Sequence, residues 1–257
     1  MSPDQYLTKW DLAAPAKLCE TPTSHVYQVL FQGEVAILKV LTALGRKDEA
    51  KAARALEYFG GVGAARLYKA DEGAHLLEHL PGRHLKDLVW ASHDSGHGSG
   101  CDTGYDLEAT EIACAVLNKL HARSHEMPKG PVPELTSMRE NFRALFALAA
   151  NPAADSLFVK GAEVAEHLLK TEDHVCVLHG DIHHTNILES KDRGWVAIDP
   201  HGLLGERTYD TANTFFNPDD LPSFVESPGR IQATCEVFSK HLSLEPRRIL
   251  DFAFAYG

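Results

Sequence analysis

The sequence predicts an α+β fold in which a small β-rich lobe precedes a larger helical lobe. In residues 1–80, β-forming residues alternate around two short turns, "QG" and "DEG". Beyond them, most apolar residues recur at helical spacing, and only one more hairpin is expected. We therefore expect an N-terminal lobe of residues 1–80 and a C-terminal lobe of residues 81–257, divided at the Pro-Gly pair that follows residue 80.

The N-terminal lobe is predicted to consist of two hairpins joined by a helix. Residues 17–40 alternate around Gln32-Gly33, and the second strand of this hairpin contains Lys39. The segment "GRKDEAKAARALEYFGG" has helical periodicity, Glu49 in its first turn and a Gly-Gly stop. Two short strands around "DEG" complete the lobe.

The C-terminal lobe begins with a segment rich in glycine, serine and histidine, residues 91–104, which we predict to be a solvated loop rather than a metal site. Helices are expected over 106–123, over 156–172, and in two segments covering 227–257. Another begins at the capping box of Ser137 and ends at Asn151-Pro152. The strands "NIL" and "WVAID" should pair as a hairpin.

Composition restricts the class of protein. The chain has 257 residues, 44% of them apolar, and a net charge of −11, which argues against a nucleic-acid partner and is compatible with a cationic ligand. No apolar run approaches the roughly 18 residues of a membrane span, and the N-terminus lacks the pattern of a signal peptide. Five cysteines without a CxxC pair indicate a reducing compartment. We expect a cytoplasmic monomer or homodimer.

The segment "VLHGDIHHTNIL" has the spacing of a kinase catalytic loop. His179-Gly180-Asp181 is followed by Asn186, with glycine in the usual arginine position, and Asp199 ends the next hairpin. Phosphoryl transfer needs a carboxylate to orient and deprotonate the attacking hydroxyl, which we assign to Asp181. It also needs hard oxygen ligands for Mg²⁺, which we assign to Asn186 and Asp199.

Lys39 and Glu49 complete this set, because an ion pair between a strand lysine and the following helix can hold the ammonium against the phosphates of ATP. Alone, each residue has a simpler interpretation. Lys39 would be an edge-strand lysine with its head in water, Glu49 a first-turn helix carboxylate, and Asp181 and Asn186 turn-capping residues. Their combined order favours the kinase.

The histidines raise the alternative of a metal-dependent hydrolase, since "HGDIHH" superficially resembles the HxHxDH loops of dinuclear hydrolases. The order differs, because the aspartate precedes His183 and His184 instead of lying between histidine ligands. We therefore interpret these two as loop-packing or substrate-side residues, with His183 as a candidate substrate contact.

"LHGDIHHTNIL", "WVAIDPHGLLGE" and "EPRRILDFAFAYG" together resemble the aminoglycoside and hydroxyurea resistance kinases, the family of the streptomycin 6-phosphotransferases. The resemblance covers nearly the whole chain. It implies a protein-kinase-like fold of the aminoglycoside phosphotransferase type, with ATP between a nucleotide-binding N-terminal lobe and a catalytic, substrate-binding C-terminal lobe. It also implies that His179 braces the catalytic loop and that the backbone at Glu78, His79 and Leu80 meets adenine.

One departure concerns the phosphate loop, where "ETPTSHVYQV" has no glycine. Hydroxyls and backbone amides from Thr21 to Ser24 would have to replace it. A second departure is His201, which follows Asp199-Pro200 where a protein kinase has Phe-Gly, so regulation by an activation loop is not expected.

The expected reaction is ATP- and Mg²⁺-dependent phosphorylation of a hydroxyl on a small, cationic molecule, with a streptomycin-type aminoglycoside as first choice. The alternatives are a metabolic kinase for choline, homoserine or a sugar, and a nucleotide-binding module without catalysis. Glu206 and Asp210 follow the Asp199 strand and are candidate carboxylates for substrate ammonium or guanidinium groups. A salt-bridged or capping role is the equally weighted alternative for both.

Overall fold

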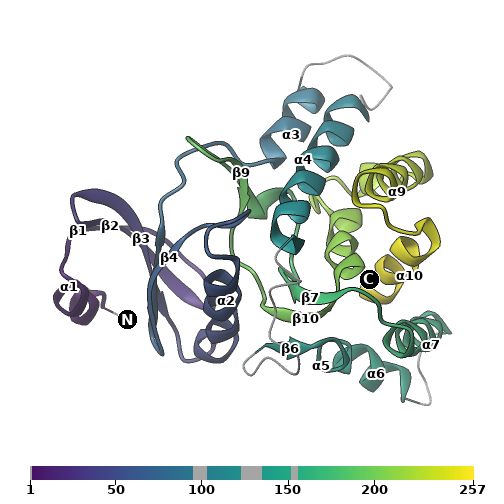
Figure 1. Cartoon of the computed structure of the whole chain (residues 1–257), viewed down its shortest axis with the longest axis horizontal. Coiled ribbons are helices and arrows are strands. Elements are labelled where there is room, and N and C mark those ends of the chain that lie inside the picture. Colours follow the sequence, from purple (N-terminus) through teal and green to yellow (C-terminus); the bar gives the residue numbers. More distant parts are fainter. Residues whose placement is uncertain (1, 95–102, 123–134, 152–155) are drawn as a thin grey trace.

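A computed structural model describes residues 2–94, 103–122, 135–151 and 156–257. An antiparallel five-stranded sheet forms the N-terminal lobe and helices dominate the C-terminal lobe, as the sequence predicts (Figure 1). The sheet has the order β1-β2-β3-β5-β4. Its strands are β1 (Leu12–Glu20), β2 (Ser24–Phe31), β3 (Glu34–Leu41), β4 (Leu67–Asp71) and β5 (Ala74–Glu78).

The predicted hairpin turn at Gln32-Gly33 is present, and both residues have positive φ, 54° and 86°, as a type I′ turn requires. The predicted helix is α2 (Gly45–Phe59), which ends at Gly60 with φ of 56°. Helix α2 lies on the side of the sheet that faces the C-terminal lobe (Figure 1).

Two elements at the N-terminus were not predicted. Helix α1 (Asp4–Trp10) precedes the sheet, and β1 is a strand additional to the predicted hairpin: it begins at Leu12 and ends at Glu20, so the segment from Lys17 that was expected to be one strand is divided between β1 and β2. Tyr6 and Trp10 of α1 are buried against apolar residues of the sheet, so tertiary contacts support a helix too short to be stable alone.

The C-terminal lobe contains three short strands in one sheet, β6 (Thr136–Ser137), β10 (Leu203–Glu206) and β7 (Val175–Leu178), and the predicted hairpin of β8 (Ile187–Ser190) and β9 (Gly194–Ala197). The elements around them are α3 (Lys86–Asp94), α4 (Thr103–His121), α5 (Met138–Asn141), α6 (Arg143–Ala149), α7 (Ser156–Lys170), the 3₁₀ helices η2 (His184–Asn186) and η3 (Arg207–Phe216), α8 (Pro222–Val225), α9 (Pro228–Leu242) and α10 (Pro246–Tyr256).

Two predicted boundaries in this lobe are wrong. The segment 91–104 is not a loop throughout, because α3 continues to Asp94 and α4 begins at Thr103; its remainder, with His97 and Cys101, lies outside the described residues. The helix predicted from Ser137 to Asn151 is two helices. Ser137 caps α5 by accepting from the Glu140 N–H, but Phe142, with φ of −80° and ψ of 4°, separates α5 from α6.

The main core joins the lobes. It contains Leu56 and Phe59 of α2 together with Val116, Leu117 and Leu120 of α4. The spacing of these three residues places them on one face of α4, and α4 packs on α9.

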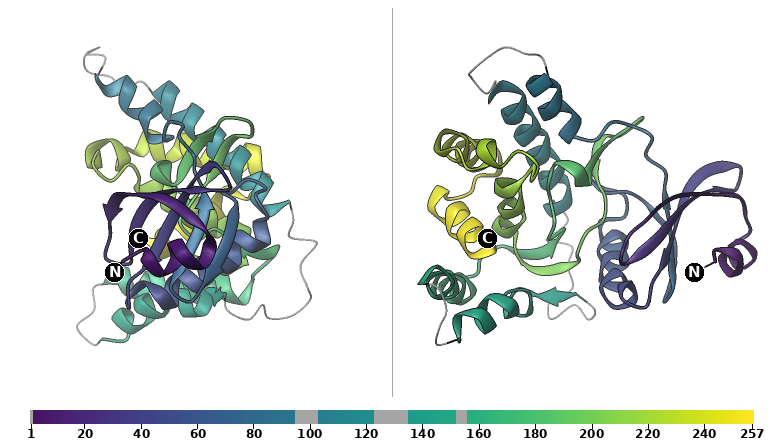
Figure 2. Two further views of the ribbon diagram at one scale, coloured as in Figure 1. Left: turned by 90° about the vertical axis from the view of Figure 1, so that its left-hand side faces the viewer. Right: turned by 180° about the vertical axis from the view of Figure 1, so that it is seen from behind.

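The β8–β9 hairpin lies between the lobes and is hydrogen-bonded to the chain before β4 (Figures 1 and 2). The Ala197 N–H donates to the Gly63 carbonyl, and the Ala65 N–H donates to the Ala197 carbonyl, both at 2.8 Å. Asp199, just after this hairpin, is thereby held beside the N-terminal sheet.

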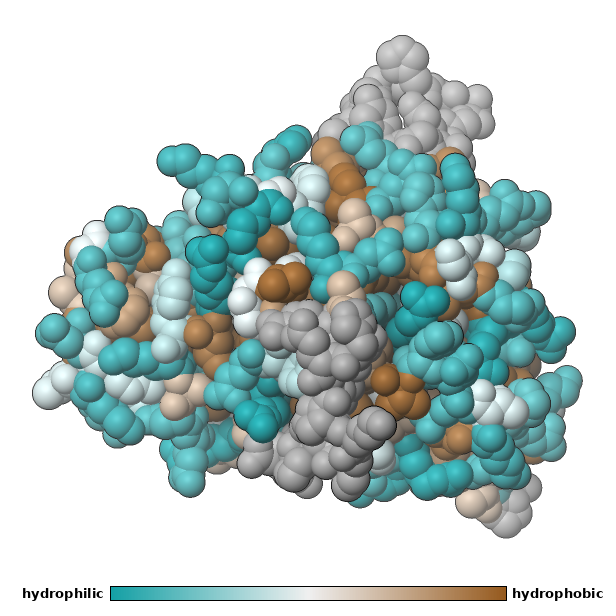
Figure 3. Space-filling model, in the orientation of Figure 1, coloured by the Kyte–Doolittle hydropathy of each residue, from teal (hydrophilic) through white to brown (hydrophobic). Residues whose placement is uncertain are grey.

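On the face shown in Figure 3, the apolar residues that the structure describes are scattered among hydrophilic ones. Among the described helices, none combines the length and the apolar character that crossing a membrane requires.

Candidate active site

The catalytic-loop segment begins at the end of β7 and depends on a glycine. Gly180 has φ of 83°, and a Cβ built on it would lie 2.7 Å from Leu203 Cγ. A side chain there would be strained and would clash, which explains why glycine occupies the usual arginine position.

His179 is completely buried behind this loop, as the family resemblance implied. Its Nδ1 accepts from the Asp181 N–H at 3.2 Å, and its Nε2 donates to the Ile198 carbonyl at 2.8 Å. Burial lowers the pKa of His179, which favours the neutral ring that these two bonds require. The imidazole thus links the catalytic loop to the chain that leads to Asp199.

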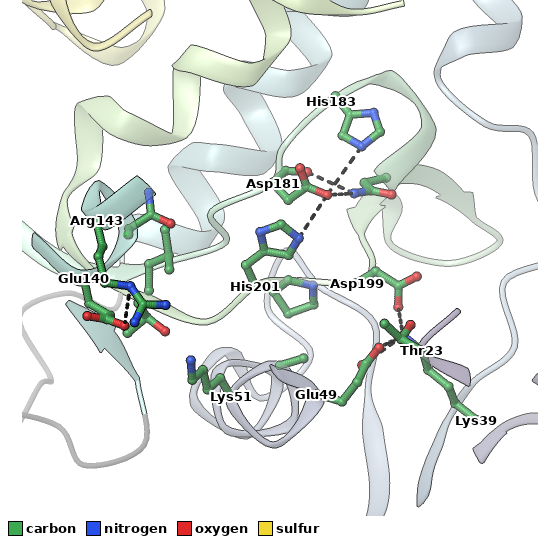
Figure 4. A pocket seen from close by; sticks show the side chains of 16 residues that line it. Thr23, Lys39, Glu49, Lys51, Glu140, Arg143, Asp181, His183, Asp199 and His201 are labelled. Atoms are coloured by element: carbon green, nitrogen blue, oxygen red, sulfur yellow. Dashed lines mark hydrogen bonds and ion pairs between the residues drawn. The ribbon is translucent and has the colours of Figure 1, made fainter. Parts of the chain in front are cut away.

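Asp181 is surrounded by hydrogen-bond donors. The Asn213 Nδ2 donates to its Oδ1 at 2.7 Å, and the Asn186 Nδ2 donates to its Oδ2 at 2.9 Å. The Nε2 atoms of His183 and His201 both lie 3.6 Å from Oδ2 (Figure 4). Burial alone would raise the pKa of Asp181, but the side chain of His183 and the electrostatic interaction with His201 outweigh it, so the pKa lies below its usual value and the carboxylate is ionised at neutral pH.

The adjacent histidines do not share a site. His183 lines the cavity beside Asp181, whereas His184 is buried, with its Nε2 3.7 Å from Asp106 Oδ1. Burial lowers the pKa of His184 to about 3, so it is a neutral packing residue. A dinuclear centre built on both histidines is therefore incompatible with the fold.

Lys39 lies on the central strand β3, paired with both β2 and β5, so the edge-strand interpretation is wrong. Its Nζ is 2.8 Å from Glu49 Oε1 and 3.2 Å from Asp199 Oδ1, and both Lys39 and Glu49 are 9% exposed. Burial alone would lower the pKa of Lys39, but Asp199 and Glu49 reverse the effect and raise it. The ammonium is therefore charged and fixed in place.

Two adjoining cavities meet at Lys39 and Asp199, and Figure 4 shows the residues that line the first of them. One, of about 560 Å³, is lined by polar residues from both lobes, including Lys39, Glu49, Glu140, Asp181, His183, Asn186, Asp199 and His201. The other, of about 470 Å³, is lined by Thr21, Ser24, Glu78, His79 and Leu80 and by apolar side chains such as Val26, Ile37, Leu77 and Ile198. The arrangement suits a flat apolar group in the second cavity and a charged, reacting group in the first.

In the second cavity, Glu78 and the turn from Thr21 to Ser24, both predicted to contact the nucleotide, also form hydrogen bonds within the protein. The Glu78 carboxylate accepts from the Arg66 N–H at 2.9 Å and from the Arg193 guanidinium, and the Glu78 N–H donates to the Arg66 carbonyl at 2.9 Å, so these groups of Glu78 already have partners. The glycine-free turn is closed by its own hydroxyls, since the Ser24 N–H donates to Thr21 Oγ1 at 3.0 Å and the Thr21 N–H donates to the Ser24 carbonyl at 2.8 Å.

The donor set of the first cavity fits a hard divalent cation. The Asn186 Nδ2 donates to both the backbone oxygen and Oδ2 of Asp181, which orients its Oδ1 away from these acceptors. Asp199 uses Oδ1 toward Lys39, and its side chain is half-exposed to the cavity. One amide oxygen and one carboxylate oxygen therefore remain for a cation, which are ligand types that Mg²⁺ prefers.

The two substrate carboxylates predicted downstream of Asp199 do not line this cavity. Glu206 forms a bidentate pair with Arg248, with both N–O distances at 2.5 Å. Asp210 is buried behind the loop, where it accepts from the backbone N–H groups of His179 and Gly180 and from His121 Nε2. The salt-bridged alternative is thus correct for Glu206, and Asp210 fixes the loop backbone instead of facing a substrate.

Sequence reasoning missed Asn213, which is separated from Asp181 by 32 residues and lies on a 3₁₀ helix that no periodicity predicted. It also missed Glu140, whose capping-box spacing offered a sufficient structural explanation.

The sequence is similar to those of known proteins. Residues 9–257 match the family described as aminoglycoside/hydroxyurea antibiotic resistance kinase. Streptomycin 3″-kinase of Klebsiella pneumoniae is 38% identical over 256 residues, covering 97% of this chain and 87% of that protein. Streptomycin 6-kinase of Streptomyces glaucescens is 28% identical over 80% of this chain, which spans only 63% of that relative.

Solved structures share the fold. An amicoumacin kinase in complex with AMP-PNP and Ca²⁺ superposes with a TM-score of 0.65 at 14% identity, over 99% of this chain and 83% of that one.

Proposed function

This chain belongs to the aminoglycoside/hydroxyurea antibiotic resistance kinase family, and we propose that it transfers the γ-phosphate of ATP to a hydroxyl of a streptomycin-type aminoglycoside, thereby conferring resistance. The observation that carries the proposal is that Asp181, Asn186, Asp199 and the Lys39–Glu49 pair line one cavity between the lobes. These are the residue types that phosphoryl transfer requires, and they occur in the order of the kinase motifs.

Each residue has a role in this proposal. Adenine occupies the apolar cavity against the backbone of residues 78–80, and Lys39, fixed by Glu49, binds the phosphates. Asn186 and Asp199 hold Mg²⁺, which neutralises phosphate charge when bound. Asp181 orients the acceptor hydroxyl and takes its proton.

The 3″-hydroxyl is the proposed acceptor, a position that the sequence motifs left open. The basis is that the chain is 38% identical to a streptomycin 3″-kinase over nearly its whole length but 28% identical to two streptomycin 6-kinases.

The purified protein should phosphorylate streptomycin with MgATP, and the position of the new phosphate can be read by two-dimensional ³¹P–¹H NMR. Kanamycin, choline, homoserine and a hexose serve as competing acceptors. Phosphate on the 6-hydroxyl would overturn the regiochemical proposal only. Turnover with choline, homoserine or the sugar but with no aminoglycoside would reject the proposed substrate and retain the kinase. No turnover with any acceptor would favour a non-catalytic module.

Glu140 is the proposed contact for a cationic group of the substrate. Of the carboxylates that line the larger cavity, Glu49 is paired with Lys39, and Asp181 and Asp199 have the roles given above. Among the residues that the structure describes, the Glu140 carboxylate has only a loose pair with Arg143, at 3.4 Å and with both side chains exposed. Its place at the start of α5 is fixed by the Ser137 cap, and it lies across the cavity from Lys39 (Figure 4).

Glu140→Gln should raise the KM for streptomycin about 1.4- to 5-fold with little change in kcat, because an exposed ion pair contributes about 0.2–1 kcal/mol. Steady-state kinetics at low ionic strength measure both constants. Glu166→Gln is the matched control, since Glu166 is paired with Arg139 on the surface and does not line the cavity. An equal KM in both variants would exclude Glu140 from substrate recognition.

A further inference from the structure

The geometry points to Asn213 as a positioning residue: we propose that its side-chain amide fixes the rotation of the Asp181 carboxylate for attack by the acceptor hydroxyl. This inference rests on the proposed function, because it concerns the same reacting group. The Asn213 Nδ2 donates to Asp181 Oδ1 at 2.7 Å, a short bond for an N–H donor, and it comes from η3, an element that the catalytic-loop motif does not include.

The orientation of the Asn213 amide follows from its neighbours. The Asn217 side chain approaches both the backbone oxygen of Asn213, at 3.0 Å, and the Asn213 side chain, at 2.9 Å. A backbone carbonyl can only accept, so the Asn217 atom at this position must be its amino group. That amino group also needs an acceptor in Asn213, which turns the Asn213 oxygen toward Asn217 and its amino group toward Asp181.

The chain of bonds continues into the interior. Arg230 is 2% exposed and donates through Nη2 to the Asn217 carbonyl at 2.7 Å. The same guanidinium is held by Asp106, with N–O distances of 3.0 and 3.2 Å. The buried ion pair between α4 and α9 therefore holds Asn217, and Asn217 in turn holds the side-chain amide of Asn213 in one orientation.

For catalysis, the consequence is that each of the two carboxylate oxygens of Asp181 has its own hydrogen-bond donor. Asn213 holds Oδ1, and Asn186 holds Oδ2 while its own oxygen faces the proposed cation. With a donor on each oxygen, the plane of the carboxylate is defined before substrate arrives, and the remaining lone pairs are directed to the acceptor hydroxyl. Without Asn213, only Asn186 restrains rotation of the carboxylate about its Cβ–Cγ bond. The carboxylate then spends less time in the orientation that can accept the proton of the hydroxyl.

The test is a double-mutant cycle measured with streptomycin and MgATP. Asn213→Ala should lower kcat about 10- to 100-fold, the change that corresponds to losing one hydrogen bond to a charged group, with KM for both substrates nearly unchanged. Asn213→Asp, the same size without a donor, should lower kcat at least as much. In an Asp181→Asn background, Asn213→Ala should have little further effect, because a residue that acts through Asp181 loses its influence when that carboxylate is gone.

Asn118→Asp is the matched control, since the exposed Asn118 on α4 also donates one side-chain hydrogen bond, to the His241 carbonyl at 3.2 Å. It should leave kcat unchanged. Equal kcat in wild type and Asn213→Asp, or additive losses in the cycle, would overturn the inference. If the wild type does not phosphorylate streptomycin, the proposed substrate is rejected and the inference about Asn213 is tested separately. The ratios of kcat between the variants are then measured on the slow hydrolysis of ATP by water.

Discussion

Asp181→Asn should reduce kcat for phosphate transfer about 10²- to 10⁴-fold while nucleotide affinity stays close to that of the wild type. The carboxylate that orients the hydroxyl and accepts its proton is lost, but the proposed phosphate and cation contacts, Lys39, Asn186 and Asp199, are retained. Asn186 also keeps its bond to the backbone oxygen of residue 181, at 3.0 Å, so its position does not depend on the carboxylate alone.

Steady-state kinetics and calorimetric titration with a non-hydrolysable ATP analogue and Mg²⁺, on the same preparation, separate the two effects. Asp251→Asn is a suitable control, because Asp251 pairs with Arg247 on the surface of α10. Loss of nucleotide binding in Asp181→Asn would make Asp181 a cation ligand or a structural anchor. Full activity would mean that the catalytic loop has been misassigned.

Arg230→Leu should lower the free energy of unfolding by about 3–5 kcal/mol, since it leaves the buried Asp106 carboxylate without its guanidinium partner. Asp106 and Arg230 are each 2% exposed, and Arg230 also donates to the carbonyls of Thr214, Phe215 and Asn217. Urea unfolding followed by circular dichroism measures the change.

Arg247→Leu is the corresponding control, because the Arg247 side chain is 78% exposed in its pair with Asp251. This substitution should lower the free energy of unfolding by less than about 1 kcal/mol. A matching value for Arg230→Leu would show that the buried pair adds nothing to stability. The double variant Asp106→Asn with Arg230→Leu should lose less than the sum of the two single variants, because the buried charge is removed together with its partner.

The sequence by itself was enough for elements whose signals are local. The turn at Gln32-Gly33, the glycine stop of α2, the cap at Ser137 and the β8–β9 hairpin are all where their residues predicted them. These features depend on backbone preferences of a few neighbouring residues, so they need no knowledge of the rest of the chain.

The residues that line the site could also be predicted, because motif spacing and residue type indicate which functional groups can lie together. The structure brings Lys39, Glu49, Asp181, Asn186 and Asp199 to one cavity, as expected, while their catalytic and cation-binding roles stay predictions.

Only the tertiary structure decided which side chains face the cavity and which support it. Glu206 and Asp210 follow Asp199 closely in sequence, yet one binds Arg248 and the other lies behind the loop. Adjacent His183 and His184 point to different environments, and Asn213 reaches Asp181 from a distant element. The physical reason is that the direction of a side chain and its contacts depend on how whole helices and strands pack. Packing brings together residues that are far apart in the sequence, and no local sequence pattern indicates that they will touch.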